Sequence, residues 1–383
     1  MNRREMLATM GAAALMQGLV PAAMAQGGSG LLGADRNVHR RYAPYDGMMV
    51  IDGCGGLGRG DEPDGDLGPL ALADGVNSGV TAAIITVAPN GRFWFGEEGY
   101  QTTLNKLDYW DRHARRHPSQ LHHIRTLADL QHAKQEKKFG LIYGFQDTSP
   151  IGEDLDRIPM YQRRGVRVIQ LTHNRRNLVG DGAMEAGNAG LSNFGHEVIQ
   201  GLEANRIVVD IAHGGRRTTL EGIQACKRPM LLSHTGCAAI SDVPRCMPDE
   251  VLRAMADRGG VAGMVFWPYL TRHGQPMAED LIGHIEHAIN VCGEDHVGIG
   301  TDAVVSAMDR TPEYERQTAE WVRHMVEMGW FEQGNMYTFI PDLNHIRRLE
   351  TLGALLSQRG HSQERIGKIL GGNFHRVMGE IWG

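Results

Sequence analysis

Residues 207–213 read Ile-Val-Val-Asp-Ile-Ala-His, an apolar run that ends in the possible metal ligand His213. Two other segments repeat this design: Met-Leu-Leu-Ser-His ends at His234, and Val-Gly-Ile-Gly-Thr-Asp ends at Asp302. Runs this short and this apolar are typical of parallel strands that are buried on both faces. Because the ends of parallel strands meet at one edge of a sheet, the pattern predicts a metal site there.

Eight apolar runs of this kind are spaced along the chain. They cover residues 48–51, 80–87, 140–145, 166–171, 207–211, 230–232, 261–266 and 297–299. Helices are predicted between the later runs, at 193–205, 217–226, 249–258 and 279–292. Eight alternations of strand and helix favour an α/β fold of the (β/α)8 TIM barrel type over a doubly wound sheet. The polar residues after the runs would then lie at the active-site end of the barrel.

The C-terminal part of the chain, from Thr311 to Gly383, is predicted to be mostly helical. The expected helices cover residues 343–358 and 363–370, and a last helix begins at Asn373 after a Gly-Gly pair. We expect this part to form a C-terminal helical cap on the barrel and not a separate domain.

Composition narrows the class of partner. The chain has 383 residues, 42% of them hydrophobic, and a net charge of -6. This is enough for one large core or two modest ones. No cluster of Lys and Arg offers the basic face that nucleic acid binding needs, so a small-molecule substrate is expected. After the N-terminus no stretch approaches 18 apolar residues, which predicts no membrane anchor. The sequence leaves a homodimer open.

The N-terminus has the pattern of an export signal. Arg3-Arg4 precedes a weakly hydrophobic stretch and then Ala23-Met24-Ala25, which is typical of a twin-arginine signal peptide with its cleavage site. The alternative is a chance Arg-Arg pair before a short apolar helix. The domain boundaries are therefore predicted as a signal peptide at 1–25, a linker at 26–45 and the barrel at 46–383, in a periplasmic protein.

The chain has five cysteines, an odd number for an oxidising compartment. At least one must therefore stay free or bind something. Cys237 and Cys246 are close enough in sequence to bridge, although sequence alone does not set the geometry.

His213 and His234 are the first candidates for metal binding, because two neutral imidazoles from adjacent strands can share one zinc ion. The alternative for each is a histidine that is merely hydrogen-bonded at a strand end. Asp302 is predicted to be either a metal ligand or the general base and acid of a hydrolysis reaction. It could also serve as a helix N-cap.

Other polar residues are candidates for substrate contacts. His173 follows a strand and could polarise a carbonyl group. Arg245 lies in a loop between prolines and could bind a carboxylate with both arms of its guanidinium, unless it is a solvated surface residue. Trp267 and Tyr269 follow another strand and could line the pocket, although packing alone would also explain them.

The chain resembles the renal or membrane dipeptidases, a family of zinc metallopeptidases with an amidohydrolase-like barrel. The resemblance extends from about Met48 to Trp382. It rests on Leu-Thr-His173-Asn, Asp210-Ile-Ala-His213, Ser233-His234-Thr, Pro244-Arg245-x-x-Pro248-Asp-Glu, Val-Gly-Ile-Gly-Thr-Asp302 and Lys368-Ile-Leu-Gly-Gly-Asn373.

The resemblance implies a role for each matching residue. His213 and His234 match the ligands of the family's second zinc, and Asp302 matches the catalytic proton carrier. His173 matches a histidine that contacts substrate, and Arg245 matches the arginine that binds the substrate's terminal carboxylate. Trp267 takes the place of a substrate-facing tyrosine.

The departures from the family pattern concentrate at the first zinc. The family's Asp-Gly-His-x-Asp is here Asp52-Gly-Cys54-Gly-Gly56, and the bridging glutamate is replaced by Gln146. A neutral amide cannot offset the repulsion between two dications as a carboxylate does. We therefore expect one metal ion, most simply zinc, on His213 and His234. Gln146, Asp147 or Asp302 and water would complete its shell, and Cys54 is either a soft third ligand or a free, buried cysteine.

The leading hypothesis is an exported metal-dependent hydrolase that cleaves a dipeptide or a similar small amide with a free carboxylate. One alternative is a non-peptidase hydrolase, lyase or isomerase on the same barrel. The other is an inactive periplasmic binding protein.

Overall fold

The computed structural model describes residues 39–58, 67–91, 94, 96–329, 331, 334–335 and 337–383. The predicted signal peptide, 1–25, and most of the predicted linker lie outside these residues. Among the described residues, no helix is both long enough and apolar enough to span a membrane.

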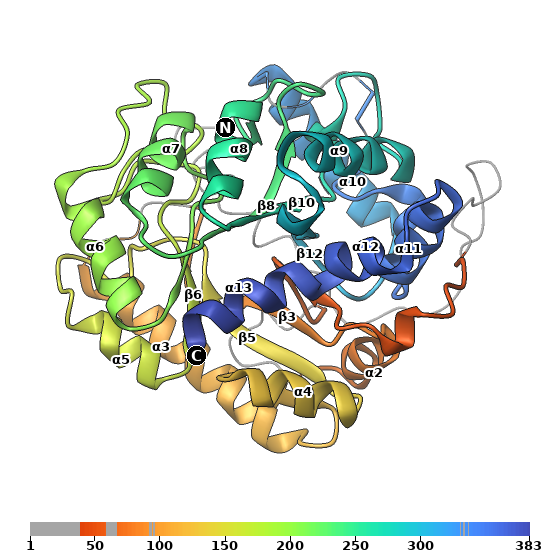
Figure 1. The fold of residues 1–383 in the computed structure, drawn as a ribbon, viewed down its shortest axis with the longest axis horizontal. Helices are drawn as coiled ribbons and strands as arrows, with labels where there is room; N and C mark the ends of the chain where they lie inside the picture. The colour runs from red at the N-terminus through yellow and green to blue at the C-terminus, as the bar shows by residue number, and fades with distance from the viewer. Residues whose placement is uncertain are drawn as a thin grey trace.

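Eight parallel strands form a barrel, in the order in which they occur along the chain (Figure 1). They are β1 (Ile51–Asp52), β3 (Ala82–Thr86), β5 (Phe139–Phe145), β6 (Val166–Gln170), β7 (Val208–Asp210), β8 (Leu231–Cys237), β10 (Val261–Met264) and β11 (Val297–Ile299). Each overlaps one of the eight predicted apolar runs, although β1 begins only at Ile51 and β8 extends to Cys237, beyond the run at 230–232. This confirms the predicted fold class. The short strands β4 (Leu121–His123) and β9 (Cys246–Met247) pair with β5 and β8 at the margins.

The barrel closes between its last and first strands. The Gly53 amide donates a hydrogen bond of 2.8 Å to the carbonyl of Ile299. Beyond this bond, β2 (Gly55–Gly56) pairs in parallel with β12 (Ala303–Val304). Cys54 and Asp302 therefore lie on adjacent segments although they are far apart in sequence.

Helices surround the sheet (Figure 1). They are α2 (Pro69–Asn77), α3 (Gly96–Arg116), α4 (Leu127–Gln135), α5 (Arg157–Arg163), α6 (Asn193–Ala204), α7 (Arg216–Ala225), α8 (Asp249–Asp257), α9 (Ala278–Cys292), α10 (Pro312–Glu327), α11 (Arg348–Gln358), α12 (Gln363–Gly367) and α13 (Asn373–Trp382). The four helices predicted between the later strands are α6 to α9.

Two of the three predicted C-terminal helices begin or end differently from expectation, whereas the last begins at Asn373 as predicted. The helix predicted at 343–358 begins at Arg348, because a separate 3-10 turn, Pro341–Leu343, precedes it. The helix predicted at 363–370 ends at Gly367 and continues as a π-turn, Lys368–Gly372. At Gly371 a Cβ would lie 2.4 Å from both Met49 O and Ile51 N, so only glycine fits where this turn crosses β1.

Helix α13 closes one end of the barrel and runs across its centre in Figure 1. Its apolar side chains form one buried cluster with residues at or near the amino ends of the strands: Phe374, Val377, Met378 and Ile381 pack with Ile51, Ala82, Val208, Leu231 and Val261. The carboxyl ends of the strands remain for the polar site. Helix α13 therefore caps the barrel at the end opposite to that site.

The end of the predicted linker is part of the packed domain. Tyr45 is fully buried, and the Tyr42 amide donates a hydrogen bond to Glu350 of α11. Burial alone would raise the pKa of Glu350, but hydrogen bonds from Arg347, His39 and the Tyr42 amide lower it to about 2. The folded domain thus begins at or before residue 42.

All five cysteines are free. The bridge between Cys237 and Cys246 that the sequence allowed is not formed.

We expect Phe374→Ala to lower the free energy of unfolding by about 3–5 kcal/mol, because it leaves a cavity at the closed end of the barrel. Urea unfolding followed by circular dichroism measures the change. Leu70→Ala is the control, since Leu70 is 79% exposed and its loss should change stability by less than about 0.5 kcal/mol. Equal effects of the two substitutions would contradict the assigned role of α13.

Candidate active site

The structure brings His213 and His234 together at the carboxyl ends of their strands. His234 lies within β8 and His213 lies three residues after the end of β7, and their Nε2 atoms are 2.7 Å apart. Both side chains are buried. Burial, reinforced by the charge of Arg245, lowers the pKa of both imidazoles well below the usual range. Both rings are therefore neutral near neutral pH, as metal ligation requires.

The outer ring nitrogens have partners that fix the tautomers. His213 Nδ1 lies 2.7 Å from Asn174 Oδ1, which can only accept a hydrogen bond. His234 Nδ1 lies 2.8 Å from Ser233 Oγ, whose own proton goes to Asp210 at 2.5 Å. Both Nδ1 atoms therefore donate, and both Nε2 atoms present lone pairs to each other. Two facing lone pairs repel unless a cation lies with them, so the residues present fit a metal ion.

The backbone at the site is strained. His213 and Asp302 have positive φ angles of 59° and 52°, which cost non-glycine residues roughly 1 to 3 kcal/mol each. Hydrogen bonds hold both in place: the Ala183 amide donates to the His213 carbonyl, and the Asp302 amide donates to the Cys54 carbonyl. The Trp267 indole also donates to the Asp302 carbonyl, at 3.2 Å. The fold thus holds these two side chains in one orientation.

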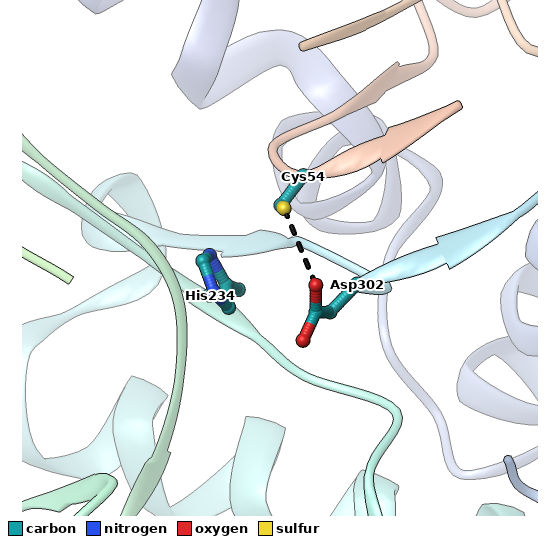
Figure 2. A group of neighbouring side chains, drawn as sticks. All are labelled: Cys54, His234 and Asp302. Carbon is teal, nitrogen blue, oxygen red and sulfur yellow. Dashed lines mark hydrogen bonds between the residues drawn. The ribbon is translucent and has the colours of Figure 1, made fainter. Parts of the chain in front are cut away.

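A third segment brings Cys54 to the same place (Figure 2). Cys54 Sγ, a ring nitrogen of His234 and a carboxylate oxygen of Asp302 lie within 4.8 Å of one another. Burial raises the pKa of Asp302 to about 6, although the charge of Arg245 acts in the opposite direction. A carboxyl group with this pKa can both take up and return a proton near neutral pH.

Gln146 is hydrogen-bonded to two neighbours at the site. Its Oε1 accepts a hydrogen bond of 2.8 Å from Asn90, and its Nε2 donates to Cys54 Sγ at 3.0 Å. The amide oxygen is bonded to Asn90 and the amide nitrogen points to the sulfur, so Gln146 supports Cys54 in this arrangement. Its role as a metal ligand stays a prediction. Asp147 is also turned away, because it accepts hydrogen bonds from Ser149 and from the His173 amide.

The predicted substrate residues line the same site. The ring of His173 stacks on His213 with 4.2 Å between centroids, and burial together with Arg245 lowers its pKa to about 3. Arg245 is 2% exposed. Its Nη2 donates to the His234 carbonyl at 3.1 Å, whereas its buried Nη1 has no hydrogen-bond partner among the described residues. A buried guanidinium with a free donor is a binding site for an anion.

A pocket opens beside Asp302 and Trp267. Its wall is mostly apolar and aromatic, and its other lining residues are Ala303, Val304, Met308, Tyr314, Thr318, Trp321, Thr338 and Phe339. Trp321 of α10 meets Trp267 edge to face at 5.8 Å. Trp267 therefore both packs against Trp321 and lines the pocket. Tyr269 lies beneath Arg245, with 5.9 Å from the guanidinium carbon to the ring centroid.

Two buried aspartates that the sequence analysis did not single out brace the site. Asp52 accepts hydrogen bonds from the Cys54 amide and from both the amide and the hydroxyl of Thr301. Asp210 repeats this pattern with the Ala212 amide and with the amide and hydroxyl of Ser233. Burial raises the pKa of Asp52 to about 7, although these hydrogen bonds oppose the shift. Both cases have the same sequence pattern. An aspartate ends one strand, and a Ser or Thr directly precedes the site residue on the neighbouring segment.

The model of the membrane dipeptidase family, peptidase family M19, matches residues 70–333. The chain belongs to this family. It is therefore a hydrolase of the metallo-dipeptidase type, and the resemblance inferred from its motifs is confirmed.

The chain is also similar to a curated dipeptidase and to solved structures over most of its length. Dipeptidase verJ of Clonostachys rogersoniana is 25% identical over 74% of this chain and 72% of its own. An amidohydrolase from Pseudomonas aeruginosa is 27% identical, covers 89% of this chain and 98% of its own, and has a TM-score of 0.74. A metallo peptidase from Rhodobacter sphaeroides, liganded with a phosphinate mimic of the dipeptide L-Ala-D-Ala, shares the fold at a TM-score of 0.69 and 17% identity, over 88% of this chain and 99% of its own.

For this family member we expect Asn174→Ala to weaken metal affinity by about 10–100-fold, because His213 loses the partner that fixes its tautomer. Ser233→Ala should act in the same way on His234. Competition with a chromophoric chelator measures both affinities. Gln101→Ala on the exposed face of α3 should leave affinity unchanged, and an unchanged affinity in Asn174→Ala would show that His213 does not bind the metal.

Proposed function

We propose that this chain is a hydrolase with one metal ion that cleaves a dipeptide or a similar small amide ending in a free carboxylate. The observation that carries the proposal is the buried Nη1 of Arg245, which has no hydrogen-bond partner in the described part of the chain. The charge of Arg245 acts on His213, His234 and Asp302 alike, so a carboxylate on this donor would lie beside the metal site.

Each residue has a role in such a reaction. A bound metal polarises the amide carbonyl and makes a water molecule more acidic. Asp302, whose pKa is raised to about 6, takes the proton from the attacking water and gives it to the leaving amine. His173 is neutral and half-buried beside His213, where a ring N–H can donate to the oxygen of the scissile carbonyl. Arg245 fixes the position of the substrate through its carboxylate.

The proposal of a single metal follows from the residues at the positions that match the family's first zinc site. Gly56 has no side chain to offer, and the oxygen of Gln146 is bonded to Asn90. A second dication would lack both its own ligands and the bridging carboxylate.

The aromatic pocket supports a preference for the substrate's side chain. Trp267 and Trp321 form one wall next to Asp302, and Phe339 and Tyr314 form another part of the lining. We therefore propose a substrate with an apolar side chain near the scissile bond, since burial of apolar surface against such a wall is favourable.

The predicted signal at 1–25 supports export to the periplasm.

We expect Asp302→Asn to retain metal at one ion per chain and to lose about 10²- to 10⁴-fold in turnover, because the proton carrier is gone. Asparagine tolerates the positive φ at this position, so the fold should persist. Elemental analysis and hydrolysis of a dipeptide panel give the two readouts. Unchanged turnover of every cleavable amide would refute this role, a stoichiometry near two would refute the single-metal site, and wild-type protein without metal or turnover would indicate a binding protein.

We expect Arg245→Met to lower kcat/KM for dipeptides by at least about 10²-fold, because a buried ion pair with the substrate is lost. The same variant should discriminate little between a dipeptide and its C-terminal amide, whereas the wild type should strongly prefer the free carboxylate. Arg216→Met is the matched control, since the Arg216 side chain is 40% exposed and pairs with Asp242. A wild type that cleaves amide and acid equally well would contradict the assigned role of Arg245.

A further inference from the structure

We propose that Cys54 is a thiolate ligand of the metal ion that His213 and His234 hold, so that the centre has one sulfur and two nitrogen ligands. This inference rests on the proposed function for the presence of the metal. The proposal adds Cys54 to the ligands of the retained ion. In the family pattern, a histidine of the first zinc site stands at this position.

The first argument is geometric. Figure 2 shows the side chains of Cys54, His234 and Asp302 converging from three different segments. Their donor atoms lie within 4.8 Å of one another, and His213 Nε2 is 2.7 Å from His234 Nε2. Zinc bonds of roughly 2.0 Å to nitrogen and 2.3 Å to sulfur place two ligands of one tetrahedral ion about 3 to 4 Å apart. The spread of 4.8 Å is wider than this, so ligation requires the sulfur to move toward the two imidazoles.

The second argument is the environment of the sulfur. Gln146 Nε2 donates to Cys54 Sγ at 3.0 Å, and Asn90 fixes this orientation by donating to Gln146 Oε1. An N–H donor directed at sulfur stabilises a thiolate, whereas the glutamate of the family pattern would repel it. The replacements at positions 54 and 146 are thus explained together: a thiolate ligand requires a neutral donor beside it.

The third argument is charge balance. The thiol of Cys54 faces the carboxylate of Asp302. Its Sγ donates to Asp302 Oδ1 at 3.6 Å. On ligation the S–H bond breaks, a metal–sulfur bond forms, and the proton passes to Asp302 or to solvent without any change in oxidation state. The thiolate supplies negative charge that the missing carboxylate ligands no longer provide.

The alternative for Cys54 is a structural cysteine without a ligand role. The chain offers a comparison in Cys226, which is also buried but lies between α7 and β8, toward the closed end of the barrel. Burial raises its pKa to about 12, and no nitrogen donor to its sulfur is found among the described contacts. Cys226 is therefore the matched control for the experiment.

The test is spectroscopy of metal-loaded protein, which does not depend on turnover. Cobalt-loaded wild-type protein should show a thiolate-to-cobalt charge-transfer band in the near ultraviolet, and X-ray absorption of the zinc form should show one sulfur at about 2.3 Å. Both signals should be lost in Cys54→Ser and in Cys54→Ala and kept in Cys226→Ser. Gln146→Leu should keep the band at a shifted energy and weaken metal affinity by about 10–100-fold.

The outcomes separate this inference from the proposed function. One metal ion per chain with only nitrogen and oxygen ligands in the wild type would overturn the role of Cys54 and leave the hydrolase proposal intact. Wild-type protein that binds no metal would overturn both. If Cys54→Ser and Cys54→Ala bind cobalt with the band unchanged, the sulfur comes from elsewhere and the inference fails. Circular dichroism of the two variants checks that they are folded.

Discussion

Two buried carboxylates, Asp52 and Asp210, hold together the strand ends on which the site depends. Each accepts one hydrogen bond from the backbone two residues later and two from a hydroxyl residue on the neighbouring strand, Thr301 or Ser233. Cys54 and His213 lie just after the aspartates, and Asp302 and His234 lie directly after the hydroxyl residues. A carboxylate is costly to bury unless its oxygens are bonded, so these contacts are strongly specified. One pattern, used twice, thus positions four side chains of the site.

The chemistry of the site follows from the small number of negatively charged groups in a buried site. His213 and His234 are neutral and their lone pairs face each other, which calls for a cation. In the proposed single-metal centre most of the carboxylates of a two-metal site are absent, and Cys54 is the anionic ligand that we propose in their place. Arg245 is left with an unused donor for the substrate. Asp302 stands between these groups with a pKa raised to about 6, which suits the transfer of a proton.

Stability and function are separated along the barrel axis. The apolar cluster around Phe374 and α13 fills the amino end, where side chains can pack without polar groups. The carboxyl end holds the strained backbone of His213 and Asp302 together with the buried charges. Strain of this kind persists only when the surrounding structure over-determines it. The packed end of the barrel and the two aspartate braces provide that support.

The sequence alone determined the eight strands, most helices and the pairing of His213 with His234, because short apolar runs and the polar residues after them are local signals. The motifs also identified the family. The contacts of Gln146, Asn174 and Cys54 were decided only by the tertiary structure. Gln146 meets Cys54 across 92 positions, and Cys54 meets Asp302 across 248. Which atom of an amide points at a sulfur depends on a third residue, Asn90, and barrel closure brings these segments together, so no local pattern encodes the contact.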